Sequence, residues 1–237
     1  MQNFVFDLYG TLVDIKTDES SVKFRKRITA YFQRLNPVVT DFFKLYEKLC
    51  AESGEGEYAE VDLYRVFLDV LNYGGTQIDG KTVKKAACYF RKKSRMRLRT
   101  YVGARTLLRR LKERGARLFI LSNAQACFTL NELKKLKLLK YFNAIELSSD
   151  FGMKKPAPEF FAFLARKYSL DPNQTVYVGN DFKADILGAK SASFKTAYIK
   201  SNLSPKSDCL ENIKPVADFA TDSFKSLCAY LLQSAEN

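Results

Sequence analysis

The sequence predicts an α/β protein: a doubly wound parallel sheet with an inserted all-helical cap domain. Two patterns along the 237 residues support this prediction. Short apolar segments alternate with helical patterns over most of the chain, whereas one long stretch near the N-terminus carries helical patterns only. The composition agrees with both patterns, because 46% hydrophobic residues are enough to bury a full core.

Six short apolar segments are predicted as strands, at residues 4–6, 117–121, 144–147, 175–178, 196–199 and 218–220. Helical patterns follow them near residues 103–114, 126–140, 157–168, 183–192 and 222–232. Strands that are apolar on both faces and separated by helices indicate a parallel sheet covered on both sides. Such sheets bind ligands at the carboxyl ends of their strands, so functional residues are expected there.

One long stretch departs from the alternation of strands and helices. It is predicted as helices only, near residues 20–35, 39–52, 58–72 and 80–97. Within it, Phe24, Ile28 and Phe32 recur at the spacing of one helix face. We interpret the stretch as a module inserted after the first strand. The predicted domains are a core of residues 1–14 and 99–237 and a helical cap of residues 15–98.

The chain contains no histidine. This absence excludes catalysis of the Ser-His-Asp and Cys-His kinds, HExxH zinc sites and histidine phosphotransfer. Any acid–base or nucleophilic chemistry must therefore come from carboxylates, lysines, tyrosines, hydroxyls or thiols.

The net charge of +13 raises the question of a polyanionic partner. The densest basic stretch, residues 91–99, is interpreted as a solvated helix face. The alternatives are a basic rim that attracts phosphorylated substrates and adventitious RNA binding. No zinc finger, RNP-type aromatic motif or helix-turn-helix pattern accompanies the charge, so no specific nucleic-acid partner is expected.

Several features bear on where the protein works. No apolar run reaches the ~18 residues that a membrane helix needs, so no membrane association is expected. The N-terminal residues lead directly into the first predicted strand, so no secretory leader is expected. Five scattered cysteines without CxxC spacing indicate reduced thiols used in packing. Together these features predict a cytoplasmic protein.

Candidate chemistry begins at Asp7, which follows the first predicted strand and would lie over the ligand crevice. Gly10 permits the sharp turn that close approach of an anion requires. Taken alone, this acid has an equally good interpretation as the end of a strand in a turn. Ser122 and Asn123 add small polar groups at the end of a second strand. Lys155, before a proline at a helix start, can neutralise an anion or steady the acid.

Two more acids follow the strand at 175–178. Asp181 and Asp185 are four residues apart near a helix start, a spacing that places them on one face. Carboxylates with water suit a hard cation such as Mg²⁺. A helix cap and an acid favoured by the helix dipole are the plainer interpretations of this pair.

In this order, the segments resemble the four motifs of the haloacid dehalogenase-like superfamily. The matching segments are Asp7-x-Tyr9-Gly10-Thr11, Ser122-Asn123, Lys155-Pro156 and Gly179-Asn180-Asp181-x-x-x-Asp185. The resemblance covers nearly the whole chain, since the helical stretch stands where the family's C1 caps are inserted. It implies a Rossmannoid core with the motifs at successive strand ends.

The resemblance also implies roles in substrate chemistry. Asp7 would attack the substrate in line and form a covalent intermediate that water then hydrolyses. The substrate would be bound by Thr11, Ser122, Asn123 and Lys155. The lysine would in addition act catalytically by countering charge in the transition state.

The metal site is implied in the same way. Mg²⁺ would be the cofactor, held by Asp7, the backbone carbonyl of Tyr9 and Asp181. Asp185 would complete or support the site. The role of Asn180, whose position varies in the family, is left open.

Tyr9 departs from the family's phosphatases, which carry at this catalytic position an aspartate that protonates the leaving group. A phenol with a reference pKa of ~10 is a poor substitute at neutral pH. The Asp-x-Tyr-Gly-Thr form is similar instead to the metal-independent 2-haloacid dehalogenases, whose halide leaves without a proton. Asp181 and Asp185 argue the other way, because two such carboxylates would repel each other without a cation.

We favour a Mg²⁺-dependent phosphatase of a small phosphorylated metabolite, acting through an aspartyl-phosphate on Asp7. The first alternative is a 2-haloacid dehalogenase with the same nucleophile and a halogenated acid as substrate. It would need a cap cation such as Arg25, Arg27 or Arg34 to hold the substrate carboxylate. The second alternative is a weakly active binding or regulatory member of the family.

Overall fold

The computed structural model describes residues 1–54 and 56–236. A six-stranded sheet has the order β5-β4-β1-β6-β7-β8, and all neighbouring strands are parallel. The strands are β1 (Asn3–Phe6), β4 (Arg117–Ser122), β5 (Ala144–Leu147), β6 (Thr175–Gly179), β7 (Lys195–Ile199) and β8 (Phe219–Thr221). The chain winds outward in both directions from β1, so the predicted doubly wound sheet is confirmed.

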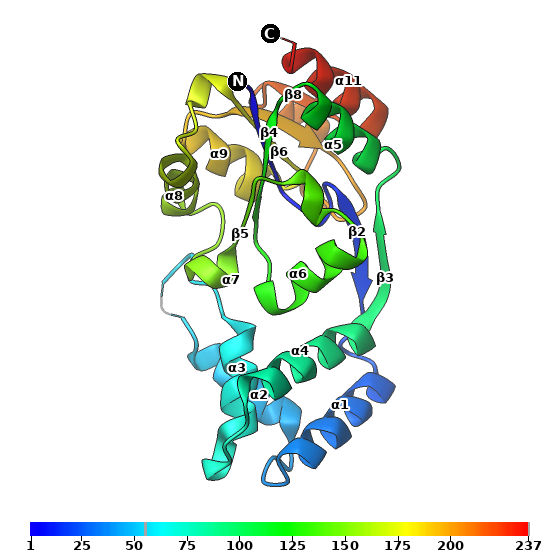
Figure 1. Cartoon of the computed structure of the whole chain (residues 1–237), viewed down its shortest axis with the longest axis vertical. Coiled ribbons are helices and arrows are strands. Elements are labelled where there is room, and N and C mark those ends of the chain that lie inside the picture. The colour runs from blue at the N-terminus through cyan, green and yellow to red at the C-terminus, as the bar shows by residue number, and fades with distance from the viewer. Residues whose placement is uncertain (55, 237) are drawn as a thin grey trace.

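Helices cover both faces of this sheet (Figure 1). On one face, α5 (Ala104–Glu113) and α11 (Phe224–Ser234) pack their leucines against the apolar residues of β1, β4 and β6. On the other, α8 (Pro158–Tyr168) contributes Phe160 and Phe161 to a second apolar cluster, which α9 (Gly188–Ser191) joins. The remaining core helices are α6 (Ala126–Lys135), η2 (Leu139–Tyr141), α7 (Ser148–Phe151), η3 (Pro172–Gln174), the π-helical η4 (Phe182–Leu187) and α10 (Leu210–Ile213).

The helices between residues 22 and 94 form a separate group in the lower part of Figure 1. These are α1 (Val22–Leu35), α2 (Phe42–Glu52), α3 (Leu63–Asn72), η1 (Tyr73–Gly75) and α4 (Gly80–Ser94). Their apolar faces meet in an aromatic cluster in which the rings of Phe32 and Phe42 lie 4.2 Å apart and those of Phe67 and Phe90 5.3 Å apart. Phe128 of α6 joins the cluster from the core. The boundaries of cap and core at residues 14/15 and 98/99 stay a prediction.

The expectation of helices alone between residues 15 and 98 was wrong at both ends. An antiparallel ribbon of β2 (Val13–Thr17) and β3 (Arg95–Thr100) joins the sheet to the helices. The predicted helix at 80–97 therefore ends at Ser94. The reason is local: from residue 95 onward, arginines alternate with Met96 and Leu98, which is the period of a strand rather than of a helix.

Ion pairs account for much of the basic stretch at 91–99. Arg97 and Arg99 donate to the two carboxylate oxygens of Asp14 at 2.9 and 3.0 Å. Arg91 and Arg95 bond to Glu132 of α6 at 2.9 and 3.3 Å. Acids on other elements therefore hold these four arginines, and the predicted helix face is wrong from Arg95 onward, where the chain is a strand.

Replacing Asp14 with Asn is expected to destabilise the ribbon in a pH-dependent way. Burial alone would raise the pKa of Asp14, but hydrogen bonds from Asn202, Arg99 and Arg97 hold it below its usual value. A depressed carboxyl pKa stabilises the folded state above about pH 4, and this contribution is lost as the pH falls through the folded-state pKa. Because the arginines are partly exposed, we expect a loss of about 1 kcal/mol at pH 7.

Urea denaturation at pH 7 and pH 3 measures this effect. The gap between wild type and Asp14→Asn should narrow at pH 3, while Asp69→Asn, an exposed acid on α3, should show no gap at either pH. A gap of equal size at both values would contradict the electrostatic explanation.

Other differences from the sequence prediction are small. The predicted helix at 126–140 ends at Lys135, and a 3₁₀ turn follows at η2. The predicted helix at 183–192 is the π-helical η4 continued by α9. Within residues 1–54 and 56–236, no helix has the length and apolar character that a membrane crossing requires.

Candidate active site

Polar side chains gather at the carboxyl edge of the sheet, over its central strands. Asp7 follows β1, which lies between β4 and β6, and Phe6 is level with Ile120 and Val178 of those strands. Ser122 ends β4, and Asn180 follows β6. Parallel strands end at the same edge, so residues far apart in the sequence meet here.

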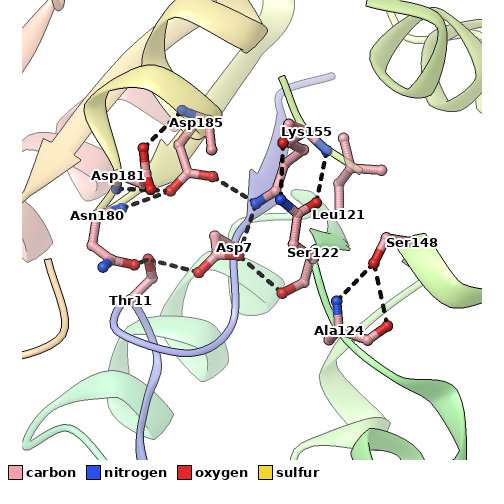
Figure 2. Close-up of polar contacts among 12 residues, drawn as sticks. Asp7, Thr11, Leu121, Ser122, Ala124, Ser148, Lys155, Asn180, Asp181 and Asp185 are labelled. Carbon is pink, nitrogen blue, oxygen red and sulfur yellow. Dashed lines mark hydrogen bonds and ion pairs between the residues drawn. The ribbon is translucent and has the colours of Figure 1, made fainter. Parts of the chain in front are cut away.

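Asp7 is held mainly through one of its two carboxylate oxygens (Figure 2). Oδ1 accepts hydrogen bonds from Ser122 Oγ at 2.9 Å and Lys155 Nζ at 2.8 Å. Oδ2 has a single long contact, 3.4 Å from Thr11 Oγ1. Burial raises the pKa of Asp7, and the Lys155 ammonium opposes that rise. The second oxygen is thus the one available for chemistry.

Lys155 is 3% exposed and lies between two carboxylates. Its ammonium contacts Asp7 Oδ1, Asp185 Oδ1 at 2.6 Å and the hydroxyl of Tyr177 at 2.8 Å. Burial alone would lower the pKa of Lys155, but the carboxylates of Asp185 and Asp7 raise it. The lysine is therefore a fixed cation, and its three donors already have partners inside the protein.

The side chain of Asn123 holds the backbone of Lys155. Its Oδ1 accepts from Lys155 N at 2.7 Å, and its Nδ2 donates to Lys155 O at 3.0 Å. Both ends of the amide are thus used within the protein. The structure places Asn123 as a support for Lys155, whereas the sequence predicted that it binds substrate.

The two acids of the fourth motif have different partners. Asp185 Oδ2 accepts from the backbone N–H groups of Asn180 at 2.9 Å and Asp181 at 3.0 Å, while Oδ1 binds Lys155. A side chain at Gly179 would lie 2.3 Å from the Asp185 carboxylate, so only glycine fits there. Asp181 Oδ1 caps η4 through Ala184 N at 2.7 Å and points away from Asp7 (Figure 2). The structure therefore does not bring these acids together toward one cation.

Asn180 contacts the loop of the first motif. Its Oδ1 accepts from Thr11 Oγ1 at 3.1 Å. A Cβ atom on Gly10 would lie within 2.5 Å of the Asn180 amide, so glycine is needed for this close approach. The residue whose role the sequence left open is thus nearer to the Asp7 loop than Asp181 is (Figure 2).

Tyr9 has its hydroxyl bound to α6. It donates to Glu132 Oε2 at 2.5 Å and lies 3.1 Å from Thr129 Oγ1. Glu132 is buried and is also the partner of Arg91 and Arg95. Burial and the Glu132 carboxylate raise the pKa of Tyr9 well above its usual value. The phenol is therefore held neutral, and its bonds are with α6 rather than with Asp7.

Sequence reasoning missed two residues of this site, Tyr177 and Glu132. Tyr177 stands between two valines in β6 and is indistinguishable from a core aromatic by pattern. Glu132 shares the buried face of α6 with Phe128, Thr129 and Leu133, and a charged residue on that face was the available signal.

Contacts from the helical region reach the loops that carry the site. Gln125, three residues after β4, bonds the backbone of residues 61 and 63 at 2.7 and 2.9 Å. Lys154, next to Lys155, donates its backbone N–H to Tyr58 O at 2.8 Å. A backbone bridge between residues 59 and 153 lies beside this bond. The segment before α3 is thus attached to both loops.

Oxygen donors dominate this edge of the sheet. Within the described ranges, no group of three or more His, Cys, Asp and Glu side chains is arranged to hold a metal. Mg²⁺, however, is commonly held by one or two carboxylates together with substrate phosphate and water. Asp7 Oδ2 has only the long contact with Thr11 among the described residues, and the same hydroxyl donates to Asn180 Oδ1. One carboxylate oxygen close to an amide oxygen therefore fits Mg²⁺ that is held together with substrate phosphate and water.

Known proteins resemble this chain in sequence. A family model described as haloacid dehalogenase-like hydrolase matches residues 1–193. The glyceraldehyde 3-phosphate phosphatase of Pyrococcus abyssi is 32% identical over 103 residues, or 44% of this chain and only 43% of that protein. The enzyme of the same name from Methanopyrus kandleri is 25% identical over 202 residues, or 77% of this chain and 84% of that protein.

Solved structures resemble it over nearly the whole length. A HAD phosphatase from Thermococcus onnurineus has a TM-score of 0.61 at 17% identity, with 98% of each chain covered. The L-2-haloacid dehalogenase of Xanthobacter autotrophicus has a TM-score of 0.54 at 20% identity, again with 98% of each chain covered. At these identities the likeness shows the fold alone.

Proposed function

This chain belongs to the haloacid dehalogenase-like hydrolases, and from that membership we propose that it is a Mg²⁺-dependent phosphatase of a small phosphorylated metabolite. The observation that carries the proposal is the bonding of the two carboxylate oxygens of Asp7. One carboxylate oxygen is held by Ser122 and Lys155, and the other has only a long contact with Thr11. A carboxylate fixed on one side and available on the other is suited to nucleophilic attack.

Asp7 Oδ2 attacks the phosphorus of the substrate, and the bond from phosphorus to the leaving oxygen breaks. Water then attacks the aspartyl-phosphate, which releases phosphate and regenerates the carboxylate. Ser122 and Lys155 keep Oδ1 in place through both steps, so that Oδ2 is presented in one orientation. Thr11 lies beside the attacking oxygen, where it can bind an oxygen of the transferring group.

Mg²⁺ would be held by Asp7, the backbone carbonyl of Tyr9 and an oxygen of either Asn180 or Asp181. When bound, it neutralises charge on the phosphoryl oxygens. Asp185 supports the site by fixing the backbone after Gly179 and by binding Lys155. We also propose a cytoplasmic location, since the five cysteines are free and partly buried.

Tyr9→Phe is expected to leave kcat within about threefold of wild type, whereas removal of a working general acid costs about 10²–10⁴-fold. The reason is that the hydroxyl is bound to Glu132 and has a raised pKa, so it does not protonate the leaving group. Steady-state rates on p-nitrophenyl phosphate and on glycerol 2-phosphate measure this. A loss of a hundredfold or more on the poorer leaving group would show that Tyr9 is the acid.

The complementary variant is Tyr9→Asp. If the missing acid limits turnover, this change should raise the rate on glycerol 2-phosphate, whose alkoxide needs a proton, and leave p-nitrophenyl phosphate little changed. No gain on any ester with a poor leaving group would mean that another step is limiting.

A second function, 2-haloacid dehalogenase, is favoured by the bond that holds the Tyr9 hydroxyl on Glu132. A hydroxyl held in this way does not protonate a leaving group, and a halide leaves without a proton. One of the cap cations expected for it, Arg25, already has partners inside the helical region. Arg25 pairs with Glu47 at 3.2 Å and stacks on Phe43 within the helical region. Arg91, whose guanidinium lies 5.8 Å from the Tyr9 ring, is nearer to the site.

The test is hydrolysis of p-nitrophenyl phosphate with Mg²⁺ and with EDTA, alongside halide release from L-2-chloropropionate. Phosphate release that requires Mg²⁺ would support the phosphatase. Halide release that survives EDTA would replace it with the dehalogenase. Mg²⁺ binding without turnover of either substrate would favour the weakly active binding or regulatory member.

A further inference from the structure

Tyr177 connects three parts of the active site through one buried hydroxyl. The hydroxyl accepts from Lys155 Nζ at 2.8 Å, and it lies 2.9 Å from Leu121 O and 3.1 Å from Asp185 Oδ1, to either of which it can donate. Its ring lies 5.5 Å from the same ammonium. No step proposed above uses this residue, although it is fully buried in the central sheet.

The bonding at Lys155 shows what the hydroxyl does. An ammonium has three donors, and here they go to Asp7, Asp185 and Tyr177. The bond to Asp185 is the shortest at 2.6 Å, so two carboxylates compete for one cation. A third fixed acceptor defines the rotation of the ammonium, and one N–H is thereby aimed at Asp7 Oδ1.

The bond to Leu121 adds a second constraint. Leu121 directly precedes Ser122, the other group that holds Asp7 Oδ1. Through Tyr177, the lysine and the serine share one support at the end of β4.

We propose that Tyr177 is the positioning residue that aims the Lys155 ammonium at the nucleophile Asp7. The activity arm of the test rests on the proposed phosphatase function. Tyr177→Phe removes the acceptor and keeps the ring. We expect kcat on p-nitrophenyl phosphate to fall about 10–100-fold, as misplacement of a catalytic group does, with KM within about threefold of wild type.

Tyr198→Phe is the matched control. Tyr198 is equally buried, on the neighbouring strand β7, and its hydroxyl bonds to Asp208 at 3.0 Å rather than to Lys155. Both variants lose one buried hydroxyl, so a comparable fall in Tm is expected for both. The proposal is overturned if kcat of Tyr177→Phe stays within threefold of wild type, or if both variants lose kcat equally.

A second measurement needs no activity, and its first part uses the wild-type protein alone. In protein labelled with ¹⁵N-lysine, the Lys155 Nζ signal should show nuclear Overhauser contacts to the Tyr177 ring. In Tyr177→Phe the signal should shift or broaden, while Tyr198→Phe should leave it unchanged. A wild-type Lys155 signal without contacts to Tyr177 would overturn the positioning role. Such contacts in a protein without phosphatase activity would overturn the proposed function alone.

Discussion

Asp7→Asn is expected to abolish turnover, with a loss of about 10⁴-fold or more. The amide has the shape of the carboxylate but is a very poor nucleophile, and single removal of a nucleophile has effects of this order in other enzymes. Ser122 can still donate to the amide oxygen, and Lys155 keeps its contact with Asp185. The loss should therefore come from the chemistry and not from disorder in the site.

The stability of this variant separates the two causes. Burial disfavours the charge on Asp7, so neutralising it should leave the free energy of unfolding within about 1 kcal/mol of wild type. The experiment measures rates on p-nitrophenyl phosphate, urea denaturation and intact mass. The intact mass excludes deamidation back to aspartate. Asp18→Asn, a partly exposed acid just beyond β2, is the control and should keep full activity. Residual activity above a few per cent would exclude Asp7 as nucleophile.

Lys155→Met is expected to have the largest effect on stability, a loss of about 3–5 kcal/mol. Methionine has nearly the length of lysine but no charge, so Asp7 and Asp185 would face each other without the cation between them. Both acids are buried, and an unpaired buried charge is costly. Turnover should fall as well, because the orientation of Asp7 depends on this contact.

Urea denaturation of Lys155→Met beside Lys154→Met tests the explanation, since the neighbouring lysine is exposed and has no acid partner among the described residues. Lys154→Met should change stability by less than about 0.5 kcal/mol. Adding Asp185→Asn to Lys155→Met should restore part of the loss, because it removes one of the two stranded charges. Equal losses for the two lysine variants would contradict the electrostatic role.

The central sheet could be predicted because its strands can be recognised from the local sequence alone. Each is a short apolar run followed by a polar residue or glycine, and this is visible without knowledge of any contact. The ribbon of β2 and β3 could not be predicted in this way. Strand β3 has the period of a strand but no apolar run to mark it, and the partner of its arginines, Asp14, lies more than eighty positions earlier in the chain.

The site was only partly predictable for the same reason. The sequence identified Asp7, Ser122 and Lys155, and the structure brings Ser122 and Lys155 within hydrogen-bonding distance of Asp7. The sequence did not reveal which hydrogen-bond partner each polar group has. The family resemblance implied that Asn123 binds substrate, whereas in the structure its amide bonds both backbone groups of Lys155. Such matches depend on side-chain orientation, which spacing alone does not encode.

The attachment of residues 58–63 to the active-site loops limits how this protein can be rebuilt. The segment is bonded by Gln125, next to one loop, and by Lys154, next to the other. A chimera that takes its helices from a relative, in order to change the range of accepted molecules, would sever these bonds at both places. The unit of exchange is therefore the helical insert together with residues 123–125 and 152–154, transplanted as one piece.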